Sequence, residues 1–287
     1  MNRPAYVTPA ALGDLISRAL QEDLGEGDHS SLASVLPDTQ QTARLLVKDH
    51  GRLAGMEVAV EIFGHYDPTL HVELLRQDGE AVSPGQVALT VSGNARSILA
   101  TERLVLNCLQ RMSGIATYTH RLNEMLRGTS TRLKDTRKTT PNFRLLEKWA
   151  VAIGGGLNHR FALYDMIMLK DNHIDMAGGI RTALERTHAY LKTCSRPLSI
   201  EIETRTLEEV EEVLRVGGVQ TIMLDNFPLD QLRQAVAMIK GRFATEASGG
   251  ITEQTLRAVA ETGVDFISVG ALTHSVKSLD LSLKAVR

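Results

Sequence analysis

The sequence predicts an α/β protein, a β/α barrel of about seven strands that need not be complete, joined to an N-terminal α+β sandwich-like domain. Two observations carry this prediction. Short apolar segments typical of strands recur through the second half of the chain, with helix-like segments between them. Polar residues follow one strand after another, and active sites of β/α barrels lie at the carboxyl ends of the strands.

The predicted barrel strands share a short apolar core and a polar or glycine-containing end. They are STRLKDT (130–136), YDMIMLK (164–170), LSIEIE (198–203), TIMLDN (221–226), FATEAS (243–248) and DFISVG (265–270). The last four start about 22 residues apart, which suits a strand plus a crossover helix in a parallel array. The segments 207–218, 229–241 and 252–263 fill these intervals, with helical apolar spacing and a glycine at the end.

Regular βα repetition gives either an open doubly wound sheet or a closed barrel. The sequence has no GxGxxG after an early strand and no GxxxxGK[ST], so the nucleotide-binding open sheets lose their main support. A polar residue at the end of any one strand marks the end of that strand as often as it belongs to a functional site. Six consecutive polar strand ends favour the barrel, and they contain Asp135, Arg137, Lys138, Lys170, Asp171, His173, Glu201, Glu203, Asp225, Asn226, Glu246, Ser248 and Gly270.

Three parts are expected along the chain. Residues 1–114 form the N-terminal domain, 115–272 the barrel, and 273–287 a C-terminal segment that packs back on the N-terminal domain. Within the first part, antiparallel-type alternation is followed by a helix over 98–110 that links the domain to the barrel. The acidic turn 22–31 lacks the calcium-loop spacing, so we expect it to cap the next segment.

Charge is unevenly distributed. The chain has a net charge of −2, yet residues 131–173 contain eight Lys and Arg against four acids. This balance argues against nucleic-acid binding and favours a cleft for one small polyanion. No apolar run is long enough to span a membrane, and no signal peptide is recognisable at the start. The only cysteines, Cys108 and Cys194, are too few for a disulfide framework, which favours a reducing cytoplasm.

A set of motifs spread over nearly the whole chain resembles the quinolinate phosphoribosyltransferases. The motifs are EDLGEGD (22–28), GRLAG (51–55), TERLVLNCLQRMSGIAT (101–117), DTRKTTP (135–141), RLLEKWAV (144–151), GGGLNHR (154–160), LKDNHI (169–174), EIET (201–204), MLDNF (223–227), EASGGI (246–251) and ISVGALTHS (267–275). Two positions depart from the family pattern, because Asn142 and Ala162 stand where glycine is usual. Neither departure removes a reactive group.

The resemblance implies a reaction. Members of this family transfer phosphoribosyl from 5-phosphoribosyl-1-pyrophosphate to quinolinate and release pyrophosphate and CO2. The product is nicotinate mononucleotide, an intermediate of de novo NAD biosynthesis. Both substrates are polyanions, which agrees with the basic segment of this chain.

The resemblance also implies site residues. The residues expected to bind the two quinolinate carboxylates are Arg103, Arg137, His159, Arg160 and Lys170. The family supplies the arginine matching Arg103 from the neighbouring subunit, so a homodimer is implied. The residues expected to bind phosphoribosyl pyrophosphate are Lys138, Asp171, His173, Glu203, Asp225, Ser248, Gly249, Gly250 and Gly270.

The implied catalytic residues are Lys138, Lys170, Glu203 and Asp225, and Glu203 and Asp225 are also the implied Mg²⁺ ligands. Glu201 and Glu203 share a face of one strand, because residues two apart do so, and Glu203 is ranked first. The carboxylates would stabilise positive charge on the ribose as pyrophosphate leaves, while cations and Mg²⁺ neutralise the leaving group. No organic cofactor is required.

Structural interpretations compete with several of these roles. His159, His173 and Asp171 could hold zinc, although such a set is common by chance. Gly154, Gly155 and Gly156 are read equally well as the end of a helix and as substrate contacts.

Other residues of the central segment are interpreted as structural. Trp149, Met166 and Met168 are expected in the core. Arg144 and Lys148 are expected on an exposed helix face with Glu147.

Two other functions remain open. One is a related transferase of the same fold, such as the proteins associated with molybdate transport or a transferase acting on nicotinate. The other is a phosphate-ligand sensor without catalytic activity. The complete set of carboxylate-binding cations argues against the first, and the presence of Lys138, Glu203 and Asp225 argues against the second.

Overall fold

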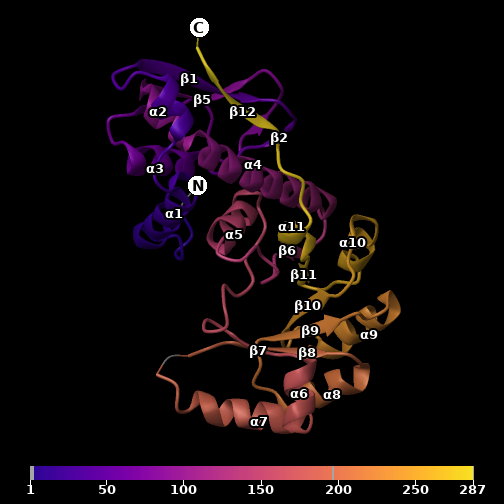
Figure 1. The fold of residues 1–287 in the computed structure, drawn as a ribbon. Helices are drawn as coiled ribbons and strands as arrows, with labels where there is room; N and C mark the ends of the chain where they lie inside the picture. The colour runs from indigo at the N-terminus through magenta and orange to yellow at the C-terminus, as the bar shows by residue number, and fades with distance from the viewer. Residues whose placement is uncertain (1–2, 196, 287) are drawn as a thin grey trace. The chain divides into compact units, whose positions relative to one another are not determined.

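The structure is a computed structural model that describes residues 3–195 and 197–286. These residues form two compact units that do not follow the order of the chain (Figure 1). The first unit combines the residues up to His120 with Lys138–Gly155 and the segment from Ala271 onward; the second combines Arg121–Arg137 with Gly156–Gly270.

The second unit contains a six-stranded parallel sheet in the order β6-β11-β10-β9-β8-β7. Its strands are β6 (Arg132–Lys134), β7 (Ile167–Leu169), β8 (Ile200–Thr204), β9 (Thr221–Asp225), β10 (Ala244–Ser248) and β11 (Phe266–Ser268). All six lie within or overlap the predicted strands. Because the first strand, β6, pairs with the last, β11, the sheet curves back on itself as in a barrel.

A seventh extended segment lies beside β6. Leu157 forms a parallel bridge with Lys134 on the edge of β6 that β11 leaves open. In the part of the chain that the structure describes, no pairing joins Leu157 to β7. The barrel is therefore incomplete between these two segments, and the predicted fold class is confirmed.

Helices connect the strands of this sheet. They are α6 (Asp171–Ala177), α7 (Ile180–Leu191), α8 (Leu207–Val216), α9 (Leu229–Ile239) and α10 (Glu253–Ala260). Helices α8, α9 and α10 confirm the three predicted helical segments and pack against β8, β10 and β11. Thr206 begins α8 by accepting a hydrogen bond from the backbone N–H of Glu209, and Gly217 ends it with a φ of 71°.

The first unit is built on an antiparallel sheet in the order β12-β1-β5-β3. Its strands are β1 (Gln40–Val47), β3 (His71–Leu74), β5 (Val87–Asn94) and β12 (Leu281–Ala285), and a small pair is formed by β2 (Gly51–Arg52) and β4 (Ala81–Val82). The helices of this unit are α1 (Pro9–Leu24), α2 (His29–Ser34), α3 (Met56–Tyr66), α5 (Arg144–Ile153), α11 (Ala271–His274) and most of α4 (Ala95–Met125). The last strand, β12, thus lies beside the first, β1.

Helix α4 is longer than the expected helix over 98–110 and continues through Gly114. A Cβ atom at Gly114 would lie 2.3 Å from the carbonyl oxygen of Lys277, so glycine lets the C-terminal segment approach the helix. The acidic turn behaves as expected: Asp28 accepts hydrogen bonds from the backbone N–H groups of Ser30 and Ser31 and caps α2.

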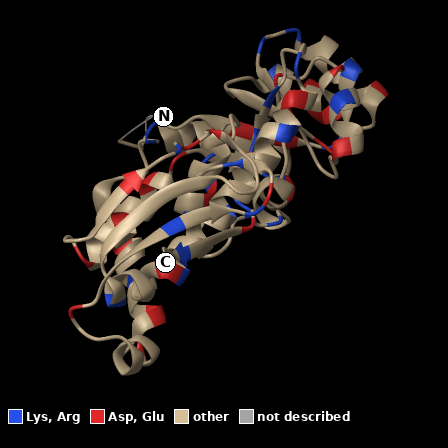
Figure 2. Cartoon of the chain, turned by 90° about the horizontal axis from the view of Figure 1, so that it is seen from above, with Lys and Arg blue, Asp and Glu red and all other residues tan. Residues whose placement is uncertain are grey.

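Acidic and basic residues both occur throughout the ribbon (Figure 2). None of the helices in the described ranges is long and apolar enough to cross a membrane.

Candidate active site

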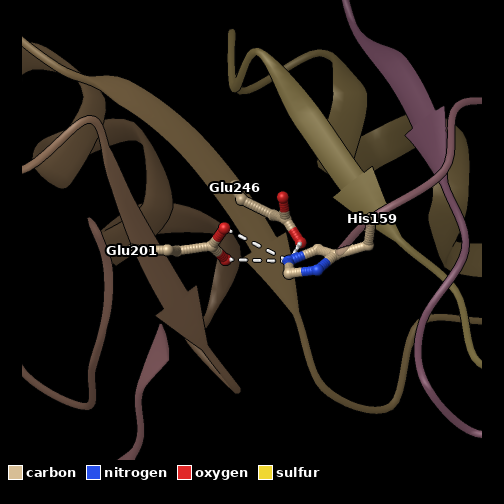
Figure 3. A group of neighbouring side chains, drawn as sticks. All are labelled: His159, Glu201 and Glu246. Carbon is tan, nitrogen blue, oxygen red and sulfur yellow. Dashed lines mark hydrogen bonds and ion pairs between the residues drawn. The ribbon is translucent and has the colours of Figure 1, made fainter. Parts of the chain in front are cut away.

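A buried group of ionisable side chains occupies the interior of the parallel sheet. His159, Glu201 and Glu246 point toward one another from the segment after Leu157, from β8 and from β10 (Figure 3). The Nε2 atom of His159 lies 3.2 Å from Glu201 Oε2 and 3.6 Å from Glu246 Oε1. Lys134 of β6 donates a hydrogen bond of 2.6 Å to Glu246 Oε2.

Burial makes this group unusual. Glu201 is 1% exposed and Glu246 is fully buried, and buried carboxylates are rare unless they are paired. Burial raises the pKa of the Glu246 carboxyl; the negative charge of Glu201 raises it further, while Lys134 opposes the shift. We name Lys134, His159, Glu201 and Glu246 the buried charge cluster.

Asp135 holds the loop that carries His159. Its carboxylate accepts a hydrogen bond of 2.7 Å from the backbone N–H of His159 and one of 2.8 Å from the Asn158 side chain. Asp135 is fully buried at the end of β6. It therefore fixes the path of the chain through the GGGLNHR segment.

Two arginines lie beside the cluster. Arg160 has a lowered pKa because it is partly buried and because the positive charge of Arg137 is close, while Asp165 and Glu201 oppose the shift. Arg160 donates one hydrogen bond, from Nη1 to the carbonyl oxygen of Met166 at 3.1 Å. Its buried Nε–H has no hydrogen-bond partner within the described ranges. The two guanidinium groups are close together, and Arg160 has a buried N–H donor that no described residue uses, so this arrangement is suited to binding an anion.

A second charged pair lies at the ends of β7 and β8. Lys170 Nζ lies 3.0 Å from Glu203 Oε2; the lysine side chain is 46% exposed and the glutamate side chain 8%. Lys170 also begins α6, where its backbone N–H donates to Nδ1 of His173 at 3.0 Å. Asp171 accepts a hydrogen bond from the backbone N–H of Asn172. Asp171 and His173 therefore shape the first turn of α6.

The ends of β9 and β10 form a glycine-lined turn. Asp225 is in register with Ser248, and the backbone N–H of Asn226 donates to the Ser248 carbonyl oxygen at 2.8 Å. Gly249 and Gly250 follow with φ values of 92° and 59°. A Cβ atom at Gly249 would lie 2.2 Å from Asn226 Oδ1, so only glycine fits. Such exposed turns at the end of late barrel strands are suited to binding phosphate.

The expected site residues are divided between the two units. The second unit holds Arg137, His159, Arg160, Lys170, Asp171, His173, Glu203, Asp225, Ser248, Gly249, Gly250 and Gly270. Arg103 is exposed on α4 in the first unit. Lys138 is also exposed in that unit, and its carbonyl oxygen accepts a hydrogen bond from Thr273 Oγ1.

The prediction that Glu147 and Lys148 lie on an exposed helix face is wrong. Both residues are fully buried. Glu147 lies 2.8 Å from Arg111 Nη2 and accepts hydrogen bonds of 2.9 Å from the backbone N–H and the hydroxyl of Thr140. Glu147 is buried because it connects α5 to α4 and to the TTP loop. Arg144, at the start of that helix, is partly exposed and donates to Thr139 Oγ1.

Two structural interpretations are confirmed. Trp149 is 2% exposed and Met168 is buried, as predicted. Met166 is only partly buried, so the prediction of a core position is wrong for that residue. Gly154 ends α5 as its C-cap, and a Cβ atom there would lie 2.6 Å from the Ala116 carbonyl oxygen.

The zinc set His159, His173 and Asp171 is not supported. In the described chain, the group of His, Cys, Asp and Glu with metal-ligand spacing consists of His159, Glu201 and Glu246. Lys134 had no role assigned from sequence, and Asp135 and Glu246 were predicted only as polar strand ends. The sequence signal that could have identified Glu246 as a site residue is its charge in the middle of a strand, ATEAS (244–248), whose other residues are uncharged.

Comparisons with known proteins agree with this arrangement. The profile of the quinolinate phosphoribosyl transferase N-terminal domain matches residues 16–113, and that of the C-terminal domain matches residues 115–284. A chloroplastic nicotinate-nucleotide pyrophosphorylase (carboxylating) of Arabidopsis thaliana is 48% identical over 285 residues, covering 94% of this chain and 81% of the relative. A probable enzyme of the same name from Bacillus subtilis is 41% identical, covering 95% of this chain and 92% of the relative.

Solved structures show the same similarity at the level of the fold. The crystal structure of NadC from Streptococcus pyogenes has a TM-score of 0.89 at 40% identity and covers 97% of this chain and 98% of its own. The nicotinate-nucleotide pyrophosphorylase from Francisella tularensis has a TM-score of 0.90 at 36% identity and covers 98% of each chain. Both family domains are matched, and the chain belongs to the quinolinate phosphoribosyltransferase family.

Proposed function

We propose that the protein is a decarboxylating quinolinate phosphoribosyltransferase, a pentosyltransferase that makes nicotinate mononucleotide for NAD biosynthesis. The relatives from Arabidopsis thaliana and Bacillus subtilis carry the corresponding name. The observation that carries the proposal is the pair Arg137 and Arg160, whose positive charges are close and partly buried. A dicarboxylate substrate would neutralise both.

Quinolinate would bind through these cations. The open Nε–H of Arg160 would be a donor for one substrate carboxylate, and the positive charge of Arg137 is close to Arg160. Lys170, half-exposed beside Glu203, supplies a third positive charge in this unit. The proposal also includes a homodimer in which exposed Arg103 contributes to the site of the partner.

Phosphoribosyl pyrophosphate would bind at the ends of β8, β9 and β10. Glu203 of β8 is in register with Met223 of β9. Asp225 lies two residues after Met223 on β9, so the Glu203 and Asp225 carboxylates lie on the same face of the sheet. Two carboxylates beside a phosphate-binding turn fit Mg²⁺, which takes few protein ligands and prefers substrate phosphates. The metal would neutralise charge on the departing pyrophosphate. The turn at Gly249 and Gly250 would hold the 5-phosphate through backbone N–H groups.

The reaction follows from these contacts. The bond between ribose C1 and the pyrophosphate oxygen breaks, and its electron pair leaves with pyrophosphate. The lone pair of the pyridine nitrogen then forms the new bond to C1. Glu203 and Asp225 stabilise the positive charge that develops on the ribose between these events. The neighbouring carboxylate next leaves as CO2, its electrons are stabilised by the pyridinium nitrogen, and the ring carbon takes a proton from water.

One assay tests the function. The protein is incubated with quinolinate, phosphoribosyl pyrophosphate and Mg²⁺, and nicotinate mononucleotide, pyrophosphate and CO2 are measured. We expect all three in equal amounts. Arg160→Ala should lower kcat/KM for quinolinate by roughly 10- to 100-fold, the cost of one hydrogen-bonded charge.

The control is Arg215→Ala, because Arg215 is an exposed arginine on α8 whose ion-pair partner, Glu211, is also exposed. Its kinetics should equal those of the unmodified protein. Binding of phosphoribosyl pyrophosphate without any turnover would instead identify a phosphate-ligand sensor.

A further inference from the structure

The backbone N–H groups of residues 159–162 are all bound by side chains. The first donates to Asp135 Oδ1 at 2.7 Å, and the second to Nδ1 of His159 at 2.8 Å. The third and the fourth donate to Asp165, to Oδ2 at 2.6 Å and to Oδ1 at 2.7 Å. Side chains that bind successive N–H groups take the place of a helix or strand ladder and define the path of a loop. The chain is therefore held on both sides of Arg160 in the sequence.

Asp165 closes the loop that runs from Arg160 to Met166 and precedes β7. Asp165 lies near the end of this loop, yet its carboxylate binds the N–H groups of Phe161 and Ala162 near the start. The residue that follows it, Met166, accepts a hydrogen bond from Arg160 Nη1 at 3.1 Å. The Arg160 guanidinium thus binds the far end of the loop through Nη1, and its buried Nε–H has no partner among the described residues.

The carboxylate of Asp165 acts on the loop and not on the core. Asp165 is exposed, and its neighbours Leu163 and Tyr164 are 67% and 61% exposed. Charge adds to the effect of the hydrogen bonds. Burial and the positive charge of Arg137 lower the pKa of Arg160, and the negative charge of Asp165 opposes this shift. Asp165 therefore favours both the position and the charge of the Arg160 guanidinium.

We propose that Asp165 is a positioning residue for the dicarboxylate substrate. By binding the N–H groups of Phe161 and Ala162, it closes the loop on Arg160 and leaves the Arg160 Nε–H open to a substrate carboxylate. This inference rests on the proposed function and adds a residue that the sequence motifs did not assign to the site.

The first experiment needs no substrate. Hydrogen exchange of the backbone amides of Phe161 and Ala162 is followed by NMR in the unmodified protein and in Asp165→Ala. We expect exchange of both amides to be roughly 10- to 100-fold faster in the variant, because each loses a hydrogen bond to a charged group. Unchanged exchange of the two amides would overturn the proposal.

The second experiment measures the two substrates separately. In calorimetry, Asp165→Ala should bind quinolinate more weakly by roughly 10- to 100-fold, as a misplacement of about 1 Å does. Asp165→Asn keeps one acceptor oxygen and should lose less affinity. KM for phosphoribosyl pyrophosphate at saturating quinolinate should change less than about twofold, because the residues proposed to bind it lie on and after β8, β9 and β10. Unchanged quinolinate affinity, or an equal loss for both substrates, would overturn the proposal.

A double variant tests whether Asp165 acts through Arg160. If it does, the protein carrying both Arg160→Ala and Asp165→Ala should bind quinolinate about as weakly as Arg160→Ala alone, because the effects of coupled residues do not add. Losses that multiply in the double variant would mean that Asp165 acts independently of Arg160, and they would overturn the proposal.

Asp67→Ala is the matched control. Asp67 also accepts a hydrogen bond from a loop N–H, that of Thr69 at 2.9 Å, but it lies in the first unit. Its quinolinate affinity should equal that of the unmodified protein. If Asp165→Ala does not fold, Asp165→Asn takes its place in each measurement. If the unmodified protein does not bind quinolinate, the proposed function fails, while hydrogen exchange still shows whether Asp165 closes the loop.

Discussion

Gly249 is the position where the structure specifies a substitution most closely. Alanine there would adopt a φ of 92°, which costs about 1–2 kcal/mol for a residue with a Cβ atom. The new Cβ would also lie 2.2 Å from Asn226 Oδ1 and 2.5 Å from Asn226 Cγ, so the Asn226 side chain must move. Its hydrogen bond of 2.6 Å to Asp225 would then be lost, at about 1.5–3 kcal/mol for a bond to a charged group.

Gly249→Ala should therefore lower the free energy of unfolding by about 2.5–5 kcal/mol, the sum of these two costs. It should also weaken binding of phosphoribosyl pyrophosphate, because Asp225 and the glycine turn are disturbed together. Urea unfolding measures the first effect, and calorimetry with phosphoribosyl pyrophosphate and Mg²⁺ measures the second.

A matched control separates backbone strain from the collision. Gly263 has a φ of 90°, and the nearest atom to a Cβ there is Val236 Cγ1 at 3.7 Å, an ordinary contact. Gly263→Ala should cost only the strain of about 1–2 kcal/mol and leave substrate binding unchanged. Equal losses of stability in the two variants, with normal phosphoribosyl pyrophosphate binding in both, would refute the reasoning.

Four further predictions concern the substrates, the dimer, the metal and the core. Nicotinate lacks the second carboxylate, so its transition state should bind more weakly by several kcal/mol, and its kcat/KM should be lower than that of quinolinate on the order of a thousandfold. Comparable turnover of both acids would contradict the assignment. Mixing Arg103→Ala with Lys138→Ala should restore part of the activity through mixed dimers, and no recovery despite subunit exchange would place Arg103 in its own site. Asp225→Asn should weaken the Mg²⁺-dependent binding of phosphoribosyl pyrophosphate in calorimetry but not that of quinolinate, and the reverse result would assign Asp225 to the other substrate. Glu147→Ala should lower the free energy of unfolding by about 3–5 kcal/mol, because Arg111 and Thr140 lose a buried partner; a loss below about 1 kcal/mol, the size expected at an exposed salt bridge, would contradict this.

Local pattern was sufficient for most elements of the barrel. The apolar spacing of 207–218, 229–241 and 252–263 predicted α8, α9 and α10, because a helix is encoded within a window of about one dozen residues. The regular spacing of the strands predicted parallel β8 to β11 for the same reason. The motifs around Arg137, Lys170 and Asp225 were also enough to recognise the family.

Contacts between distant segments required the tertiary structure. Arg144 and Lys148 have the spacing of an exposed helix face that includes Glu147, yet Glu147 and Lys148 are buried. Glu147 is buried because it binds Arg111 and the TTP loop. Gly114 lies within α4 because only glycine there lets the carbonyl oxygen of Lys277, from far along the chain, approach the helix.

The neighbours of His159 were decided in the same way. Glu201 and Glu246 contact His159 (Figure 3), although they lie 42 and 87 residues after it in the sequence. A residue's type and its local period are properties of the sequence, and they determined which elements form and which chemistry is available. Which side chains meet depends on the register and curvature of the parallel sheet, and these arise only when all of its strands are assembled.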